Sequence, residues 1–132
     1  MAERLWRIND LYAATPVHAA ELLSVIALDN LAKIAARARG LLEKNRALLN
    51  RCFDSCADLE IVRPEFGTVA FPRLRQGTVE NLFTVLRDKY ETTVVPGKFF
   101  GAPQHFRIGV GGETEMTREG LDRLASALRE LN

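Results

Sequence analysis

Arg107 is the residue best placed to bind a charged ligand, within the alternating segment Phe-Arg-Ile-Gly-Val at 106–110. In a pleated strand the three apolar residues of this segment point to one face, and Arg107 and Gly109 point to the other. If the apolar face meets a core, the guanidinium lies on the open face beside a residue without a side chain. A guanidinium is a rigid fork of donors that suits a carboxylate. The segment is compatible with a carboxylate site, although the spacing alone favours a solvated arginine.

A second candidate is the loop Val-Pro-Gly-Lys-Phe-Phe-Gly at 95–101, which places two adjacent aromatic residues between glycines. The glycines permit a chain reversal, and Phe99 and Phe100 need cover from other groups. The loop can form the wall of a cleft, or it can bury its aromatic side chains in the core of its own domain. The sequence favours neither arrangement over the other.

Other combinations of reactive residue types carry less information. The glycine-rich segment 109–112 precedes a helix but lacks the full phosphate-binding fingerprint, so it predicts a sharp strand-to-helix turn. Cys52 and Cys56 are four residues apart, and a zinc site would need His18 and His105 as well. We therefore predict no metal site and no Ser/His/Asp or Cys/His catalytic set, and we expect both cysteines to be buried or half-buried thiols.

The first half of the chain has the periodicity of a helix. Thr15 can cap this helix, and Pro16 fits its first position. Apolar residues then recur at steps of three and four as far as residue 50, which predicts one apolar stripe. An unbroken helix over 16–50 would be about 50 Å long. We therefore expect a bend near Asp29–Asn30 or at Gly40, or packing against something outside this chain.

The second half changes to short strands and two further helices. Strands are predicted at 59–63, 67–72, 92–95 and 106–110. Pro64 ends the first of them. Thr78 caps one helix, and Thr117 caps the last, with Met116 and Leu121 forming a hydrophobic staple across it. This order predicts an α+β fold of two layers, in which helices cover one face of a small, mostly antiparallel sheet after a long N-terminal helix.

The composition is that of one globular domain. The chain has 132 residues, and its 18 basic and 17 acidic side chains give a net charge of +1. This balance argues against a nucleic-acid binder that works through clustered positive charge. The longest stretch without a charged residue, from Leu11 to Ala20, is too short to cross a membrane. We expect no secretory signal and no disulfide framework, and therefore a cytoplasmic protein.

Several segments follow one another in an order that is typical of a known family. They are 66–74 (FGTVAFPRL), 94–97 (VVPG), 100–101 (FG), 105–109 (HFRIG) and a terminal helix with paired leucines. Together they resemble the end of the class I/II aminotransferases, which are pyridoxal-phosphate-dependent enzymes of fold type I. Segments in the first half, at 21–28, 37–39 and 45–46, resemble the long helix that links the large domain of these enzymes to the small one. The resemblance covers nearly the whole chain.

The resemblance implies a single domain over 1–132, similar to the C-terminal small domain of these enzymes. In it, 1–53 forms the long linking helix region and 54–132 forms the α+β sheet region. The resemblance also implies that Arg107 binds the α-carboxylate of the substrate and that Phe100, at the edge of the active site, is a substrate-binding residue. The implied partners are an amino-acid or 2-oxo-acid substrate, a missing large domain and a second copy in a homodimer, with neither nucleic acid nor membrane.

The lysine that carries the cofactor in this family has no counterpart in the matching segments. In family members it lies in the large domain and forms a Schiff base with pyridoxal phosphate. Lys33, Lys44, Lys89 and Lys98 lack the family's serine-lysine context. The resemblance thus implies the C-terminal substrate-recognition domain of an aminotransferase, which binds no cofactor covalently and is inactive alone. The alternative is a non-catalytic remnant, or an interaction or regulatory module of the same fold.

Overall fold

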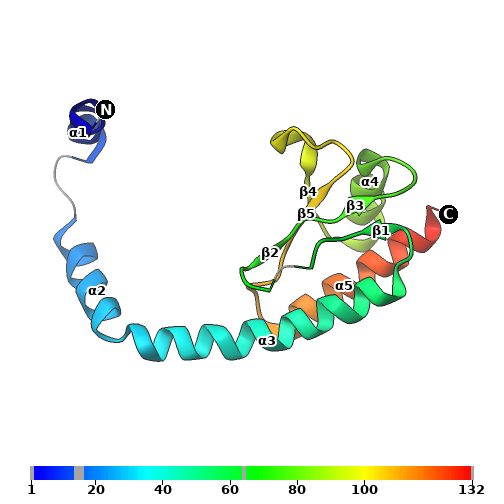
Figure 1. The fold of residues 1–132 in the computed structure, drawn as a ribbon, viewed down its shortest axis with the longest axis horizontal. Coiled ribbons are helices and arrows are strands. Elements are labelled where there is room, and N and C mark those ends of the chain that lie inside the picture. The colour runs from blue at the N-terminus through cyan, green and yellow to red at the C-terminus, as the bar shows by residue number, and fades with distance from the viewer. Residues whose placement is uncertain (1, 14–16, 64, 132) are drawn as a thin grey trace. The chain divides into compact units, whose positions relative to one another are not determined.

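The structure, a computed structural model, describes residues 2–13, 17–63 and 65–131. The chain divides into two compact units, Met1–Arg37 and Ala38–Asn132. The helices are α1 (Ala2–Ala13), α2 (His18–Asp29), α3 (Leu31–Ser55), α4 (Val79–Tyr90) and α5 (Thr114–Glu130), and a 3₁₀ helix, η1, covers Gly97–Phe100. The strands are β1 (Leu59–Glu60), β2 (Val69–Ala70), β3 (Arg73–Leu74), β4 (Val95–Pro96) and β5 (Phe106–Gly109) (Figure 1). The predicted α+β fold with a long N-terminal helix is confirmed.

A break at Asn30 separates α2 from α3. The Asn30 backbone N–H still donates to the carbonyl of Ile26 at 3.2 Å, and its side-chain amide donates to the same carbonyl at 2.9 Å. These bonds satisfy a carbonyl that the end of α2 leaves open, and the interruption predicted near Asp29–Asn30 is confirmed. α3 continues through Gly40, while the predicted start signal at Thr15–Pro16 lies outside the described residues. No helix in the described part of the chain is long and apolar enough to cross a membrane.

Two small antiparallel sheets hold the strands of the second unit. In one sheet β5 lies between β2 and β4, and in the other β1 pairs with β3. A bridge between Arg73 and His105 joins the two sheets. The spatial order β2-β5-β4 places β5, which carries Arg107, at the centre of the larger sheet.

The strands are shorter than the sequence predicts, for identifiable reasons. The predicted strand 67–72 is paired as a strand only at Val69–Ala70, because Pro72 has no N–H to donate to a ladder. The predicted strand 92–95 is displaced to Val95–Pro96, since the Thr92 N–H instead donates to the Leu86 carbonyl of α4 at 3.0 Å. β1 ends at Glu60, and Pro64 lies outside the described residues. β3 and η1 have no counterpart in the prediction, because such short elements show no period.

One apolar core joins the strands to α3, α4 and α5. Phe106 and Val110 are buried on one side of β5, and Ile108 packs against the same cluster. Arg107 and Gly109 are exposed, so the alternation predicted for this segment is confirmed. Figure 1 shows α4 and α5 lying together on one side of β5. The helices contribute mainly leucines to the core: Leu49, Leu82, Leu86, Leu121, Leu124 and Leu128.

Thr78 and Thr117 have different roles at the helix starts. The Thr78 hydroxyl accepts a hydrogen bond from a first-turn N–H at 3.3 Å, and it caps α4 as predicted. The predicted cap of α5 is wrong, because the turn after β5 is tight enough for the helix to begin already at Thr114. Thr117 lies within that helix, and its hydroxyl donates to the Glu113 carbonyl at 3.0 Å. The predicted staple is wrong as well, since Met116 is 70% exposed.

Asn45 connects α3 to the turn between β5 and α5. Its side chain is fully buried, and Nδ2 donates to the carbonyls of Val110 at 2.9 Å and Gly112 at 2.7 Å. Oδ1 is also buried, and none of the described groups donates to it. The two bonds hold the sharp strand-to-helix turn that the glycine-rich segment predicts.

Candidate carboxylate-binding site

Arg107 occupies the middle of the open face of the three-stranded sheet. On one side it pairs with Val95 of β4. On the other side the β2–β5 register continues as far as the bridge that joins the two sheets, and this register sets Phe71 opposite Arg107. The next residue of β5 on the same face is Gly109. The guanidinium is therefore flanked by an aliphatic side chain, an aromatic side chain and an empty position.

The guanidinium of Arg107 contacts an aromatic ring and no carboxylate. Its Cζ lies 5.6 Å from the centroid of the Phe100 ring, within the range of a cation–π contact. Among the described residues no acidic side chain forms an ion pair with it. By contrast Arg73, two positions beyond Phe71, pairs with Glu60 at 2.9 Å. The N–H groups of Arg107 are thus available to the carboxylate of a ligand.

The 3₁₀ helix η1 presents Phe100 to the guanidinium. Gly97 is required at its start, because a Cβ there would lie 2.2 Å and 2.4 Å from two backbone carbonyl oxygens. Gly101 ends the turn with φ of 70°, in the left-handed region that favours glycine. Phe99 and Phe100 are 71% and 54% exposed. The loop therefore does not bury its aromatic side chains in the core of the domain.

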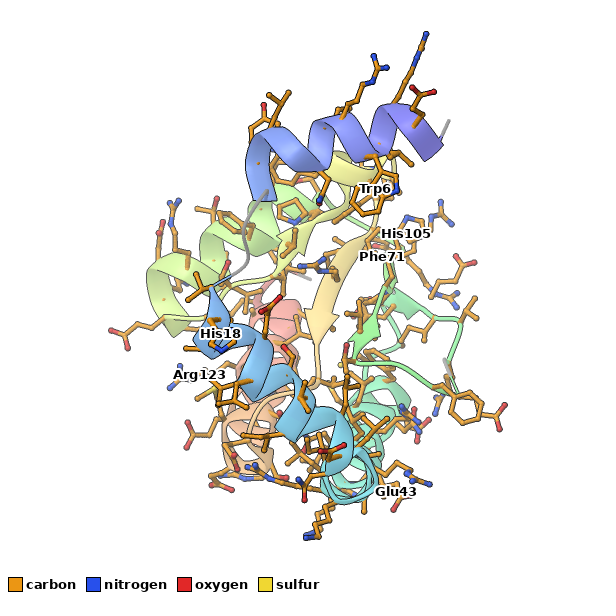
Figure 2. The ribbon with its side chains drawn as sticks, turned by 90° about the vertical axis from the view of Figure 1, so that its left-hand side faces the viewer. Trp6, His18, Glu43, Phe71, His105 and Arg123 are labelled. Carbon is orange, nitrogen blue, oxygen red and sulfur yellow. The ribbon has the colours of Figure 1, made fainter. Side chains whose placement is uncertain are left out.

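Two residues that sequence reasoning missed, Phe71 and His105, complete this face. Phe71 stacks on the imidazole of His105, with centroids 5.0 Å apart and planes 17° apart (Figure 2). It also meets Phe100 edge-on, with centroids 5.8 Å apart and planes at 89°. The contacts form a continuous series from His105 through Phe71 and Phe100 to Arg107. A sequence signal existed for His105, which stands two residues before Arg107 and so shares its face of the strand.

The cysteines do not add a reactive site. Cys56 is buried and Cys52 is half-buried, which confirms the expectation for both thiols. Burial, and then the neighbouring Cys56, raises the pKa of Cys52 to about 12. This shift disfavours the thiolate, the form that binds metals and attacks electrophiles. Within the described ranges no three potential metal ligands come together.

The fold defines a small α+β domain that carries an exposed arginine, without an acidic partner among the described residues, on the open face of its sheet. Comparison with known proteins identifies the family of this domain. Residues 2–124 match the family described as aminotransferase class I and II. The chain therefore belongs to this family, whose cofactor is pyridoxal phosphate.

The relatives of this chain are longer proteins. The "Probable aspartate/prephenate aminotransferase" of Aquifex aeolicus is 29% identical over 98 residues, a match that covers 70% of this chain and 25% of that protein. A PLP-dependent aminotransferase from Streptococcus suis has the same fold, with a TM-score of 0.90 at 24% identity over 97% of this chain and 34% of its own. An aromatic aminotransferase from Pyrococcus horikoshii gives 0.83 at 24% identity over 98% and 36%. The chain thus spans about a quarter to a third of its relatives' length.

Among the described residues, the lysines do not lie in the setting that a Schiff base with pyridoxal phosphate requires. A lysine that forms a Schiff base must be able to lose its proton. A hydrogen bond from Lys89 to Glu130 at 2.6 Å instead raises the pKa of Lys89. Lys98 pairs with Glu80 at 3.4 Å, and the other two lysines lie exposed on α3. Two of the four lysines therefore lie in surface ion pairs with carboxylates.

Proposed function

We propose that this chain is the C-terminal substrate-recognition domain of a pyridoxal-phosphate-dependent aminotransferase, which transfers an amino group between an amino acid and a 2-oxo acid. Residues 1–132 form this single domain, with 1–53 as the linking helix region and 54–132 as the sheet region, in a cytoplasmic enzyme. The observation that carries the proposal is the exposed guanidinium of Arg107, which has no acidic partner among the described residues and lies against Phe100. Arg107 binds the carboxylate that amino acids and 2-oxo acids share, and Phe100 flanks the bound substrate.

The strength of the carboxylate contact argues for a second domain. In open water an ion pair of this kind contributes at most about 1 kcal/mol, which is too little to hold a small substrate. The same pair is stronger in a site from which water is excluded. A large domain that covers the open face of the sheet would exclude that water, and it would also supply the Schiff-base lysine. We therefore expect the chain to be inactive alone, and we expect the complete enzyme to be a homodimer.

The test uses a fusion protein. Residues 1–132 replace the matching part of the Aquifex aeolicus relative, so that this chain is joined to a lysine-bearing large domain, and transamination of L-aspartate is measured. Arg107→Gln removes the fork of donors and should lower kcat/KM by about 30-fold or more, the effect of breaking a buried charge pair. Arg87→Gln is the matched control, because Arg87 also lies 5.6 Å from an aromatic ring, that of Phe83, but on α4.

Two outcomes would contradict the proposal. One is a fusion protein with bound cofactor in which Arg107→Gln and Arg87→Gln have the same small effect. The other concerns the chain without a partner, mixed with pyridoxal phosphate and treated with borohydride. A stoichiometric adduct on one of its lysines, together with transamination, would show that the chain has a complete active site of its own.

A second candidate function is that of an interaction module of the same fold. The observation in its favour is the apolar surface of α2, where five side chains are between 49% and 67% exposed: Leu22, Leu23, Val25, Ile26 and Leu28. Contiguous exposed apolar side chains mark surfaces that bind other proteins. Leu23→Glu, measured by sedimentation, tests this candidate. Loss of self-association with no effect of Arg107→Gln on fusion activity would favour the module over the enzyme domain.

A further inference from the structure

The contacts of Arg107 extend beyond Phe100 to two residues without an assigned role. The edge of Phe100 meets Phe71 at 5.8 Å, and Phe71 stacks on His105 at 5.0 Å. His105 and Arg107 lie two residues apart on the same face of the chain, and Phe71 faces them from the neighbouring strand. The contacts therefore start at His105, just before β5, and end at Arg107 within β5, and Phe71 of the neighbouring chain segment links the two through Phe100.

The position of the guanidinium depends on Phe100, and the position of Phe100 depends on Phe71. An arginine on an open sheet face has many rotamers, and binding a carboxylate with both N–H groups requires one of them. The Phe100 ring is 54% exposed, so the core does not fix it. Its ring contacts are with Phe71 on one side and the guanidinium on the other. Phe71 thus limits where the ring can place the guanidinium.

His105 holds Phe71 by stacking. The two planes differ by 17°, and the imidazole is half-buried. Its Nδ1 is buried, and among the described residues it has no hydrogen-bond partner. Packing against Phe71, rather than a hydrogen bond at Nδ1, therefore orients the ring. A phenylalanine ring at position 105 should stack on Phe71 in the same way. It would also remove a buried polar atom that has no hydrogen-bond partner.

The aromatic series is not part of the core. Phe71 is 38% exposed, and neither Phe71 nor His105 belongs to the cluster that joins α3, α4 and α5. A purely structural role would place these rings against that cluster. Their contacts instead run along the open face toward the guanidinium.

We propose that Phe71 and His105 are positioning residues, which fix Phe100 and through it the guanidinium of Arg107 in the orientation that binds a carboxylate. The inference rests on the proposed function for the identity of the ligand. The geometry of the four side chains does not depend on that function. The two can therefore be tested separately.

The first test uses the full chain, labelled with ¹⁵N-arginine, and follows the Nε–H resonance of Arg107 by NMR. Phe100→Leu removes the ring next to the guanidinium and should move this resonance. Phe71→Leu and His105→Leu should move it in the same direction, because each releases the Phe100 ring. His105→Phe, which preserves the stack, should leave the resonance in place. Phe99→Leu is the matched control, since the adjacent Phe99 contacts Lys98 instead.

The result that overturns the proposal is specific. If Phe71→Leu and His105→Leu leave the Arg107 resonance at the wild-type position while Phe100→Leu moves it, the two residues do not position the guanidinium. If His105→Phe moves it as far as His105→Leu, the stack is not the cause. Thermal unfolding of each variant tests whether the fold is kept. In a folded variant, the NMR resonances of Arg87 and the other arginines should also remain unchanged.

The second test uses the fusion protein and separates binding from turnover. His105→Leu and Phe71→Leu should each raise KM for L-aspartate by about two- to fivefold, the loss of one cation–π contact, with kcat unchanged. His105→Phe should restore KM. A fall in kcat at constant KM would overturn the positioning role. If instead Arg107→Gln leaves kcat/KM unchanged, the proposed function fails, and the NMR result still decides whether the four side chains are coupled.

Discussion

Replacing Asn45 should destabilise the fold through two hydrogen bonds that can be counted. Nδ2 donates to the carbonyls of Val110 and Gly112 at 2.9 Å and 2.7 Å, from a side chain with no exposed surface. Each bond contributes about 1 kcal/mol, and a buried carbonyl left without a partner costs about 1–3 kcal/mol more. Part of this loss is offset, because the unpaired Oδ1 disappears as well. Asn45→Ala should therefore reduce the free energy of unfolding by about 2–4 kcal/mol.

The assay is urea unfolding followed by circular dichroism, with Asn50→Ala as the control. Asn50 lies on the same helix, is only half-buried and should give a change within about 0.5 kcal/mol. Asn45→Asp should lower the free energy of unfolding more than Asn45→Ala does, because it places a carboxylate next to two carbonyl oxygens. Stability of Asn45→Ala within about 0.5 kcal/mol of the wild type would refute the reasoning. It would show that the turn after β5 holds without these bonds.

Three further predictions concern other positions. Gly97→Ala should destabilise by about 3 kcal/mol or more, measured by the same unfolding assay, since its Cβ would lie 2.2 Å from a carbonyl oxygen; a stable variant would mean that the loop can open without loss. Glu91→Gly should stabilise by about 1 kcal/mol, because Glu91 ends α4 with φ of 47°; a lower midpoint would contradict this. The pKa of Cys52 is about 12 in the folded chain, raised by burial from an ordinary value of 9.0, so the fold favours the protonated thiol. Stability should therefore fall as pH rises from about 9 toward about 12, and Cys52→Ala should show less of this fall; equal slopes for both proteins would contradict the assignment.

The central strand was predictable because its periodicity coincides with its burial. The alternation at 106–110 places Phe106 and Val110 in the core and Arg107 on the open face, as a period of two requires. The length of the apolar stripe predicted a bend near Asp29–Asn30 or at Gly40, or packing outside the chain, and the structure has the break at Asn30. In both cases a pattern that can be read along the sequence agrees with the burial or the helix break that the tertiary structure shows.

The aromatic contacts of Arg107 were not predictable in this way. Phe71 reaches the guanidinium's neighbourhood only through the register between β2 and β5, and that register belongs to strands of two and four residues. No local periodicity in the sequence predicts this register. Thr117 illustrates the opposite error, since a good capping residue lies inside α5 because the turn before it lets the helix begin earlier. Contacts that depend on strand register, and helix starts that depend on the preceding turn, can be predicted only when the fold is known.

The loop that carries Phe100 is closed by its own backbone. The Gly97 N–H donates to the His105 carbonyl at 2.7 Å, the Ala102 N–H to the Gly97 carbonyl at 3.0 Å, and the His105 N–H to the Ala102 carbonyl at 2.9 Å. These bonds draw on no group outside 97–105. The backbone of the segment therefore keeps its turn through its own bonds, while contacts with Phe71 and Glu80 outside it set where its side chains lie. An exchange of this segment between related proteins would therefore require that Phe71 be exchanged with it.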